Sequence, residues 1–463
     1  MKLRPSPPDI PLIGGFTTKN DLFELKPFAE QLTNLAQNLE QPLVLLIDSP
    51  WGSGKSTFCR QWAGLLRSRG MHVIYFDAFE HDHQDDAFTV LAGEILSSSG
   101  KVGSAKIKEA FVDSAKKVGA ALLPFAVKAA VRVGTMGILS GDSLDGLGEE
   151  LKEVVSGSLD DGAAVTEELI KEKLSNAEEE RKHLEHFKAK LSDLAQQLST
   201  KEKTRSGPLI FIIDELDRCR PTFALNILER VKHLFAVEGI CFVLVSHKKQ
   251  LEAIVRGSYG NEFDAAIYLQ KFFHLRVNLP SAAFEKRPKS LEKYITYVWN
   301  DLTPASNAKD QGYDNRTIAG LAALAVVHRL ELRDIEHVMS DLMLFLAATT
   351  GKFRPDPLVV VLAIMKLRDL TLFERCVTGQ VNWLEVKEFI RQSAWPESAV
   401  RAGWYEEWWQ GTLDPNWNDK KGAEVSRAIS QSINQYNFSD PKRALTWIAS
   451  IMAEFRVSQP RNA

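Results

Sequence analysis

The sequence has little of what marks secreted, membrane-spanning or DNA-coating proteins. Its four cysteines are scattered without metal-ligand spacing, which excludes a disulfide framework and favours reduced, buried thiols in a cytoplasmic protein. The formal net charge is -3, so charge gives no general attraction to nucleic acid. Residues 1–13 contain Pro5, Pro7 and Pro8 and no apolar run long enough for a secretory signal. Length and composition instead predict a globular protein of about two or three domains.

The most informative stretch is a glycine-rich segment after an apolar run over 43–47. It reads Ser49-Pro-Trp-Gly-Ser-Gly-Lys-Ser-Thr57 and leads into a helical pattern over 58–66. Strand, loop and helix in this order predict a phosphate-binding loop, because backbone N–H groups and a helix N-terminus then point at an anion. The first glycine of the pattern G-x-x-x-x-G-K-[ST] is replaced by Ser49, and its remaining positions are intact. The alternative is a glycine-rich turn that binds nothing, which the flanking strand and helix disfavour.

Each residue of this loop has an expected role. Lys55 would reach the β- and γ-phosphates of a nucleotide, and the Ser56 hydroxyl would coordinate Mg²⁺. We therefore predict a nucleotide-binding set that consists of Trp51, Gly52, Ser53, Gly54, Lys55, Ser56 and Thr57.

A second apolar run, over 209–213, ends in Asp214 and Glu215. In open α/β sheets ligands bind at the carboxyl ends of the strands. Asp214 is the expected carboxylate on the Mg²⁺ side, directly or through water. Glu215 is placed to orient and deprotonate the attacking water. The alternative, a polar strand end without function, is improbable in a chain that also has the loop at Lys55.

Three further residues near these strands are candidates. Arg218 could sense the γ-phosphate from its own or another subunit, or it could pair with Asp217 or Glu229 at the surface. Ser246 ends an apolar strand over 239–245 and is placed like a polar γ-phosphate sensor. His247 is more often a neutral bystander at such a place.

Residues 97–207 interrupt this αβ alternation. Their most apolar part, over 118–139, contains Lys128 and Arg132, and a central charge costs ~2.5–3.5 kcal/mol in a spanning helix. We expect a core-packing or interfacial helix there and leave peripheral membrane contact as the alternative. Further on, apolar residues repeat at helical spacing, which favours packing on the domain's own sheet over a coiled coil. That stripe consists of Leu184, Phe187, Leu191, Leu194 and Leu198.

For three other patterns we prefer a structural interpretation to a functional one. The cluster His81, Asp82, His83, Asp85 and Asp86 is more often a loop or helix cap than a metal site. The aromatic run over 404–409 with Trp417 lies among acidic residues, which favours core packing or a protein contact over nucleic-acid stacking. Beyond residue 280 the pattern is helical, and Arg329, Arg333 and Arg354 lie there; any of them could be a second phosphate sensor, but solvated helix faces are the default interpretation.

Together these segments resemble the KAP family of P-loop NTPases. The resemblance covers about residues 21–280 and rests on Pro50-Trp-Gly-Ser-Gly-Lys-Ser56, Ile213-Asp-Glu-Leu-Asp-Arg-Cys-Arg-Pro221, Leu228-Glu-Arg-Val-Lys232, the later Phe-Val-Leu strand and Tyr268-Leu-Gln-Lys-Phe-Phe273. It implies an ASCE-type core, in which an extra strand separates the P-loop strand from the Asp-Glu strand, and an insertion between the two motifs. Many members carry membrane-spanning helices in that insertion, from which this sequence differs by Lys128 and Arg132.

The resemblance has functional implications as well. The family often has Asp-Asp where this chain has Asp214-Glu215, a change that removes no metal or phosphate ligand. Bacterial relatives are frequently linked with defence against phage and plasmids. Lys271 looks like a family position near the nucleotide, and an exposed helical lysine is the competing interpretation.

We therefore predict an α/β fold, a three-layer P-loop NTPase sandwich with a mostly parallel sheet. The expected domains are a core over 1–96 and 208–280, a helical insertion over 97–207 and a helical domain over 281–463.

The leading function is a cytoplasmic Mg²⁺-dependent ATPase that couples hydrolysis to conformational change or assembly, with protein partners or self-association through the helical regions. The alternative is a nucleotide-gated scaffold or membrane-associated switch with little turnover, and a small-molecule kinase comes third. No Asn-Lys-x-Asp motif for guanine is present, so ATP is the default and the choice between ATP and GTP stays open.

Overall fold

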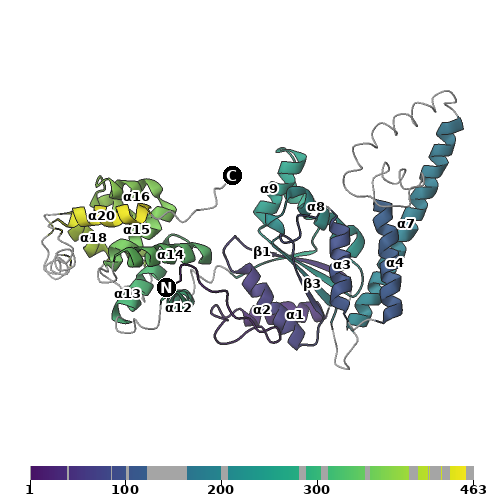
Figure 1. Cartoon of the computed structure of the whole chain (residues 1–463), viewed down its shortest axis with the longest axis horizontal. Helices are drawn as coiled ribbons and strands as arrows, with labels where there is room; N and C mark the ends of the chain where they lie inside the picture. The colour runs from purple at the N-terminus through teal and green to yellow at the C-terminus, as the bar shows by residue number, and fades with distance from the viewer. Residues whose placement is uncertain are drawn as a thin grey trace.

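The structure is a computed structural model (Figure 1). It describes residues 2–38, 41–84, 86–100, 104–122, 164–199, 207–280, 288–303, 311–349, 355–395, 405–414, 417, 429, 438 and 440–454.

A five-stranded parallel sheet forms the centre of the first half of the chain. Its strands are β1 (Leu43–Asp48), β2 (Val73–Asp77), β3 (Leu209–Asp214), β4 (Ile240–Ser246) and β5 (Leu275–Asn278). Their order is β2-β3-β4-β1-β5, and every pair is parallel. Strand β4 thus separates the P-loop strand β1 from the Asp-Glu strand β3. The predicted α/β P-loop class is confirmed, with a described sheet that is wholly rather than mostly parallel.

Helices cover both faces of this sheet and bury alternate strand residues. Helices α1 (Lys26–Gln37) and α2 (Lys55–Ser68) share one core with Leu45 and Ile47. The other face packs Val44 and Leu46 against the remaining helices of the core. These are α3 (Ala87–Ser99), α8 (Pro221–Arg230), α9 (Lys248–Tyr259) and α10 (Ala265–Leu269), with a π-helical turn η3 (Val231–Phe235). The strands β1, β3 and β4 are buried along their whole length, which explains why their sequences are continuous apolar runs, whereas the edge strand β5 is largely exposed.

Between β2 and β3, two long helices extend away from the sheet. They are α4 (Ala105–Leu122) and α7 (Ala164–Ser199), drawn at the right of Figure 1. The predicted stripe on α7 packs into the core of the sheet through Phe187, Leu191, Leu194 and Leu198, as expected. The apolar stretch that we discussed over 118–139 lies mostly outside the described residues. No helix in the described part of the chain is both long and apolar enough to cross a membrane.

The second half of the described chain is helical and has a core of its own. Its helices are α12 (Pro288–Leu302), α13 (Gln311–Val327), α14 (Leu332–Ala348), α15 (Asp356–Arg368), α16 (Leu370–Val377), α17 (Trp383–Ile390), α18 (Tyr405–Leu413) and α20 (Pro441–Glu454), with a 3-10 turn η5 (Gln392–Ala394). Trp408 and Trp409 are buried in this core, which confirms core packing for the aromatic run. Trp404 lies outside the described residues.

The start of the chain runs along this helical region before it reaches the sheet. Lys2 pairs with Asp301 at 2.6 Å, the Ser6 amide donates to the same carboxylate at 2.7 Å, and Ser340 donates to the Leu3 carbonyl at 2.6 Å. The first residues therefore contact α12 and α14. The division of the chain into the three domains given above stays a prediction.

Two smaller expectations are also settled. All four cysteines, Cys59, Cys219, Cys241 and Cys376, are free and buried. Asp86 is the N-cap of α3, accepting from the Phe88 amide at 3.0 Å. The helix cap that we expected in the His81 cluster is thus present at Asp86; among the described residues, no group of three or more His, Cys, Asp or Glu side chains could hold a metal ion.

Candidate nucleotide-binding site

The glycine-rich loop connects β1 to α2, and two of its residues need a left-handed backbone. Gly52 has φ 80° and Gly54 has φ 88°, a region that residues with a Cβ rarely adopt. Gly54 is the N-cap of α2, which begins at Lys55. The loop therefore ends at a helix N-terminus, where unpaired backbone N–H groups favour an anion.

Lys55 bends back onto the loop that precedes it. Its Nζ donates to the Ser49 carbonyl at 2.6 Å and to the Pro50 carbonyl at 3.0 Å. Burial lowers the pKa of Lys55, against the opposing charges of Asp217, Asp214 and Asp48. The amine is thus held inside the loop by two carbonyl groups and surrounded by acidic side chains.

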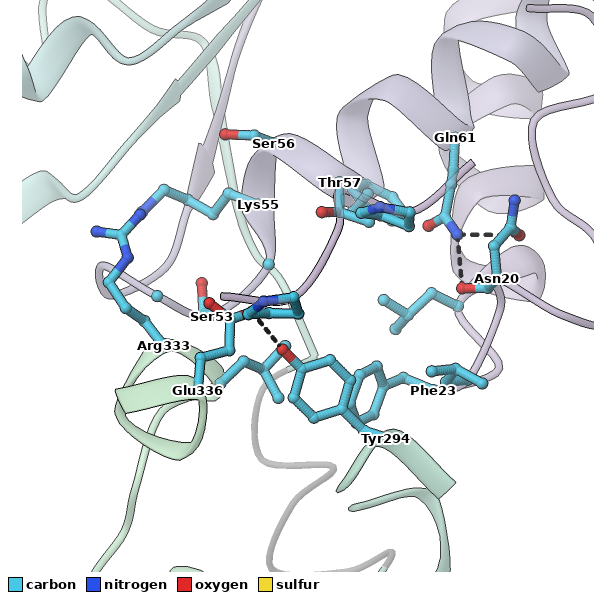
Figure 2. Close-up of a pocket in the computed structure, with 18 of the residues that line it drawn as sticks. Asn20, Phe23, Ser53, Lys55, Ser56, Thr57, Gln61, Tyr294, Arg333 and Glu336 are labelled. Atoms are coloured by element: carbon cyan, nitrogen blue, oxygen red, sulfur yellow. Dashed lines mark hydrogen bonds between the residues drawn. The ribbon is translucent and has the colours of Figure 1, made fainter. Parts of the chain in front are cut away.

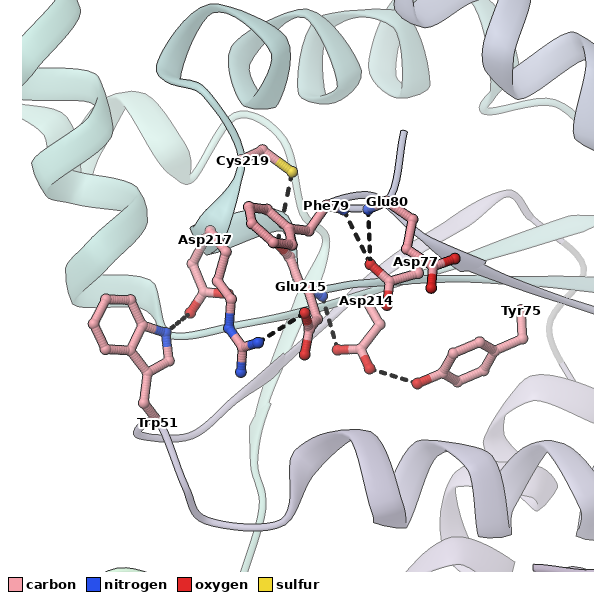
Figure 3. Close-up of polar contacts among 10 residues, drawn as sticks. Trp51, Tyr75, Asp77, Phe79, Glu80, Asp214, Glu215, Asp217 and Cys219 are labelled. Atoms are coloured by element: carbon pink, nitrogen blue, oxygen red, sulfur yellow. Dashed lines mark hydrogen bonds and ion pairs between the residues drawn. The ribbon is translucent and has the colours of Figure 1, made fainter. Parts of the chain in front are cut away.

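Asp214 lies at the carboxyl end of β3, where the sheet places it beside α2 (Figure 3). Its Oδ2 accepts from the Tyr75 hydroxyl at 2.5 Å, and its Oδ1 accepts from the Glu215 amide at 2.8 Å. Burial and the Asp214 charge raise the pKa of Tyr75, so the phenol stays a neutral donor. Asp214 is 1% exposed, and these two bonds fix its carboxylate.

Glu215 is held by its backbone and by an arginine. Its φ of 58° is left-handed, a conformation that costs a non-glycine residue of order 1 kcal/mol. Its Oε2 accepts from Arg218 at 2.8 Å. Burial raises the pKa of Glu215, as do Asp77, Asp214 and Asp217, while Arg218 lowers it. Arg218 therefore pairs with Glu215 rather than with Asp217 or Glu229.

Asp217 connects three segments that meet at this place. It lies in the one-turn 3-10 helix η2 (Leu216–Arg218), directly after β3. Its Oδ2 accepts from Trp51 Nε1 at 2.7 Å and from the His247 amide at 2.8 Å. The phosphate-binding loop, the end of β3 and the end of β4 are thus linked through one carboxylate oxygen. Sequence reasoning considered Asp217 only as a surface partner of Arg218.

A cavity of about 230 Å³ extends from the loop toward the start of the chain and α12. It is lined by residues 51–58, Asp214, Glu215, Asp217 and Arg218, and on the other side by residues 19–23, Gln61, Tyr294, Tyr297, Leu332, Arg333 and Glu336. All the predicted site residues except Ser246 line it. Ser246 is fully buried, and no described residue hydrogen-bonds its hydroxyl.

The far half of this cavity is aromatic and amide-lined (Figure 2). The rings of Phe23 and Tyr294 lie 5.7 Å apart, and the Tyr294 hydroxyl donates to Glu336 at 2.6 Å. Gln61 donates to the backbone oxygen of Asn20 at 2.9 Å and to its side-chain oxygen at 3.2 Å. No motif distinguished these residues in the sequence, because they come from four separate segments.

The N-terminus of α14 packs directly against the loop. The Arg333 amide donates to the Gly52 carbonyl at 3.4 Å. A Cβ on Gly52 would lie 2.8 Å from the Arg333 Cβ, and one on Gly54 would lie 3.3 Å from the Leu332 side chain. Of the three arginines proposed as a second sensor, Arg333 lines the cavity and Arg354 lies outside the described residues. Lys271 lies over the Tyr268 ring at 5.7 Å and is exposed, away from this cavity.

The polar groups in the near half suit a magnesium nucleotide. Ser56 and Asp214 both line the cavity and offer the oxygen ligands that Mg²⁺ prefers. Mg²⁺ commonly takes one or two protein ligands and completes its shell with water and phosphate oxygens. The residues present fit that ion without a larger cluster of carboxylates.

Comparisons with known proteins identify the family of this chain. No curated protein matches the chain. Two solved structures of the Aeropyrum pernix ORC2 protein are similar: the ADP form at 11% identity and TM-score 0.35, covering 97% of each chain, and the ADPNP-ADP complexes at 12% identity and TM-score 0.29, covering 96% of each. Both scores are low, so the site is interpreted from this chain alone. The family model for the KAP family P-loop domain matches residues 25–350, and this chain therefore belongs to the KAP family of P-loop NTPases.

Proposed function

We propose that this chain binds ATP with Mg²⁺ in the cavity at Lys55 and hydrolyses it. One observation carries the proposal. Lys55, Ser56, Asp214 and Glu215 come from two distant segments and line the same cavity at a helix N-terminus. A lysine, a hydroxyl and two carboxylates at the edge of a parallel sheet are the groups that phosphoryl transfer to water requires.

The near half of the cavity would hold the phosphates. Phosphate oxygens would replace the Ser49 and Pro50 carbonyls as acceptors for Lys55, and the amides at the start of α2 would donate to them. Ser56 and Asp214 would hold Mg²⁺, which when bound neutralises phosphate charge. Residues 51–54 and Thr57 would complete the loop around the phosphates, and Ser246 would sense the γ-phosphate only after a rearrangement that exposes its hydroxyl.

Glu215 would act on the attacking water. Its pKa is raised by burial, which improves a carboxylate as a proton acceptor near neutral pH. Arg218 would orient Glu215 in the free protein and, because it lines the same cavity, would contact the γ-phosphate once the pair opens. The alternative is that Arg218 acts as an arginine finger on the γ-phosphate bound by another subunit.

The far half would hold the nucleoside and report its presence to the helical region. Phe23 and Tyr294 offer a stacking surface for a base, and Tyr294, Leu332 and Arg333 belong to the C-terminal helices. A nucleotide that contacts both halves would favour one arrangement of α12 and α14 over another. We propose this as the route by which nucleotide state changes conformation or assembly of the three proposed domains.

A nucleotide-gated switch with little turnover is the second candidate, and one observation favours it. In the structure Glu215 is bound to Arg218, and Lys55 is bound to loop carbonyls, so both chemical groups are already engaged. Hydrolysis then requires that both pairs open. A switch would need only nucleotide binding.

Phosphate release from ATP and equilibrium nucleotide binding decide between these two. We expect the parent protein to hydrolyse ATP, Lys55→Ala to lose binding and turnover, and Glu215→Gln to lose turnover and keep binding. Lys117→Ala, which removes an exposed lysine of α4 paired with Asp113, is the matched control and should behave like the parent. Binding without turnover in the parent would establish the switch, and no binding of any nucleotide would refute both.

The cellular role is proposed on family membership alone. A function in the cytoplasm, with protein partners and in defence against phage or plasmids, is supported by the KAP match and by no residue of this site. Phage plaque counts on cells that carry the parent or Lys55→Ala test it. Equal counts for the two would contradict a defence role that depends on nucleotide.

A further inference from the structure

We propose that Asp217 is a positioning residue that fixes the phosphate-binding loop to the ends of β3 and β4, and that the Trp51 indole is its contact on the loop. This inference rests on the proposed ATPase function. It assigns a role to two residues that do not need to touch the reacting atoms.

The first observation is that Asp217 is a charged side chain with little access to water. It is 7% exposed, and a carboxylate in that setting is costly unless hydrogen bonds compensate it. Its compensation comes from elsewhere in the chain, because Trp51 Nε1 and the His247 amide both donate to the same oxygen. The bond to Trp51 is visible in Figure 3.

The second observation concerns what these three segments carry. Trp51 precedes Gly52 in the loop, Asp217 follows Glu215 by two residues, and His247 follows Ser246. The loop and the end of β4 are thus each joined by one hydrogen bond to Asp217, which lies two residues after the proposed base. Misplacement of a reacting group by about 1 Å can cost about 10²-fold in rate, so a link of this kind affects turnover.

The third observation is that the Trp51 ring itself is poorly packed. It is 40% exposed, whereas Trp62, on the helix that follows, is fully buried and donates to Thr33 at 3.0 Å. Burial of the ring therefore does not hold Trp51 in place as it holds Trp62. The hydrogen bond to Asp217 is the polar contact that orients it.

Asp217→Asn tests whether the hydrogen bonds or the charge of Asp217 carry this role, because it removes the charge and keeps an oxygen that can accept both hydrogen bonds.

The test compares kcat and the Kd for ATP in Trp51→Phe, Asp217→Ala, Asp217→Asn and the double variant Trp51→Phe/Asp217→Ala. Trp51→Phe keeps an aromatic ring and removes the donor. We expect kcat to fall about tenfold in Trp51→Phe and at least as much in Asp217→Ala, with the Kd of Trp51→Phe changed less than about threefold. The double variant should be no slower than Asp217→Ala, since both changes break one link. Asp217→Asn should recover most of the kcat lost in Asp217→Ala.

Trp62→Phe is the matched control, because it removes an indole hydrogen bond that faces α1 rather than the cavity. It should lower thermal stability and keep the parent kcat. The inference is overturned if Trp51→Phe has the parent kcat, or if the effects of Trp51→Phe and Asp217→Ala multiply. Should Asp217→Ala not fold, Trp51→Phe and Asp217→Asn decide alone. A parent protein that does not bind ATP would refute the proposed function and this inference together, whereas an active parent with an equally active Trp51→Phe refutes only the inference.

Discussion

The two halves of the cavity are built in different ways. The near half consists of one continuous loop and one strand end, and its side chains are already fixed by hydrogen bonds within 2.5–3.0 Å, from Lys55 to Ser49 and Pro50 and from Tyr75 to Asp214. The far half is assembled from the start of the chain, α2, α12 and α14. Its contacts are a ring pair and two hydrogen-bonded side chains. Under the proposed function the near half would supply the chemistry, whereas the far half would supply affinity and a connection to the helical region.

The strongest test of this contrast is Lys55→Ala. Of the described residues that line the cavity, Lys55 and Lys19 are the lysines, and Lys19 lies at the far side, so this change removes the amine beside the loop. We expect turnover to fall by more than about 10³-fold and ATP binding to weaken strongly, since both ground state and transition state lose phosphate neutralisation. Phosphate release and calorimetric binding measure the two effects. Residual turnover near that of the parent would show that the near half is not the reacting half.

Glu215→Gln should have the next largest effect. Removal of the proton acceptor is expected to lower kcat by about 10²-fold or more, while the Kd for ATP stays within a few-fold because Glu215 does not hold the phosphates. Phosphate release at fixed times and equilibrium binding of ATP, measured on one preparation, give kcat and Kd. A parallel loss of binding would assign Glu215 to the ligand shell rather than to the water.

In the far half, Phe23→Ala should weaken ATP binding and leave the chemical step intact. Loss of one stacking ring costs about 1–3 kcal/mol in nucleotide complexes, so we expect the Kd to rise roughly tenfold with kcat nearly unchanged. Leu12→Ala, at an exposed site earlier in the same segment, is the control. A drop in kcat at saturating ATP would contradict the division between the halves.

The pH dependence of kcat sharpens the role of Arg218. Burial raises the pKa of Glu215 and the Arg218 charge lowers it, while Asp77, Asp214 and Asp217 raise it. Arg218→Met should therefore raise this pKa further, so the loss of activity on acidification should begin at a higher pH than in the parent. Turnover is measured from pH 5 to 8, with Arg220→Met as the control, because Arg220 contacts the carbonyl groups of Asp82 and Gln84 instead. An equal loss at every pH would indicate that Arg218 contacts phosphate.

The smallest expected effect is that of Tyr294→Phe. This change removes the hydrogen bond to Glu336 and leaves the ring beside Phe23. A hydrogen bond to a charged group contributes about 1.5–3 kcal/mol to the fold, but the nucleotide gains only the positioning of the ring, so we expect at most a few-fold change in Kd. Fluorescent-nucleotide titration detects it, and a change as large as that in Phe23→Ala would mean that the hydroxyl itself contacts the nucleotide.

The same contrast explains what could be predicted from the sequence. Residues 49–57 and 209–215 are local patterns, in which an apolar strand leads to polar groups at its carboxyl end, so the class of the fold and the near half of the cavity were accessible. The parallel order with β4 between β1 and β3 followed from the family resemblance and is confirmed by the sheet.

The far half was not accessible, for a physical reason. Phe23 and Tyr294 become neighbours only through packing of the start of the chain against α12, and neither lies in a pattern that differs from an ordinary core position. Asp217 was misjudged similarly, since its partners Trp51 and His247 are distant in sequence. The burial of the Ser246 hydroxyl, away from the cavity, could not be read from its place after a strand. Among the three arginines proposed as a second sensor, Arg333 stands out only because α14 packs on Gly52, a contact that the sequence does not show.

That docking has a consequence for how mutational maps of this protein are interpreted. Gly52 meets α14 through its main chain, by its carbonyl and by a face where no side chain fits. Under the proposed coupling, a signal between the loop and the helices at this point would be carried by peptide groups, which substitutions of neighbouring side chains leave in place. An alanine scan of α14 can therefore look silent while the mechanical connection persists, and replacement of the Arg333 amide by an ester, or of Gly52 by a bulkier residue, is what would disconnect it.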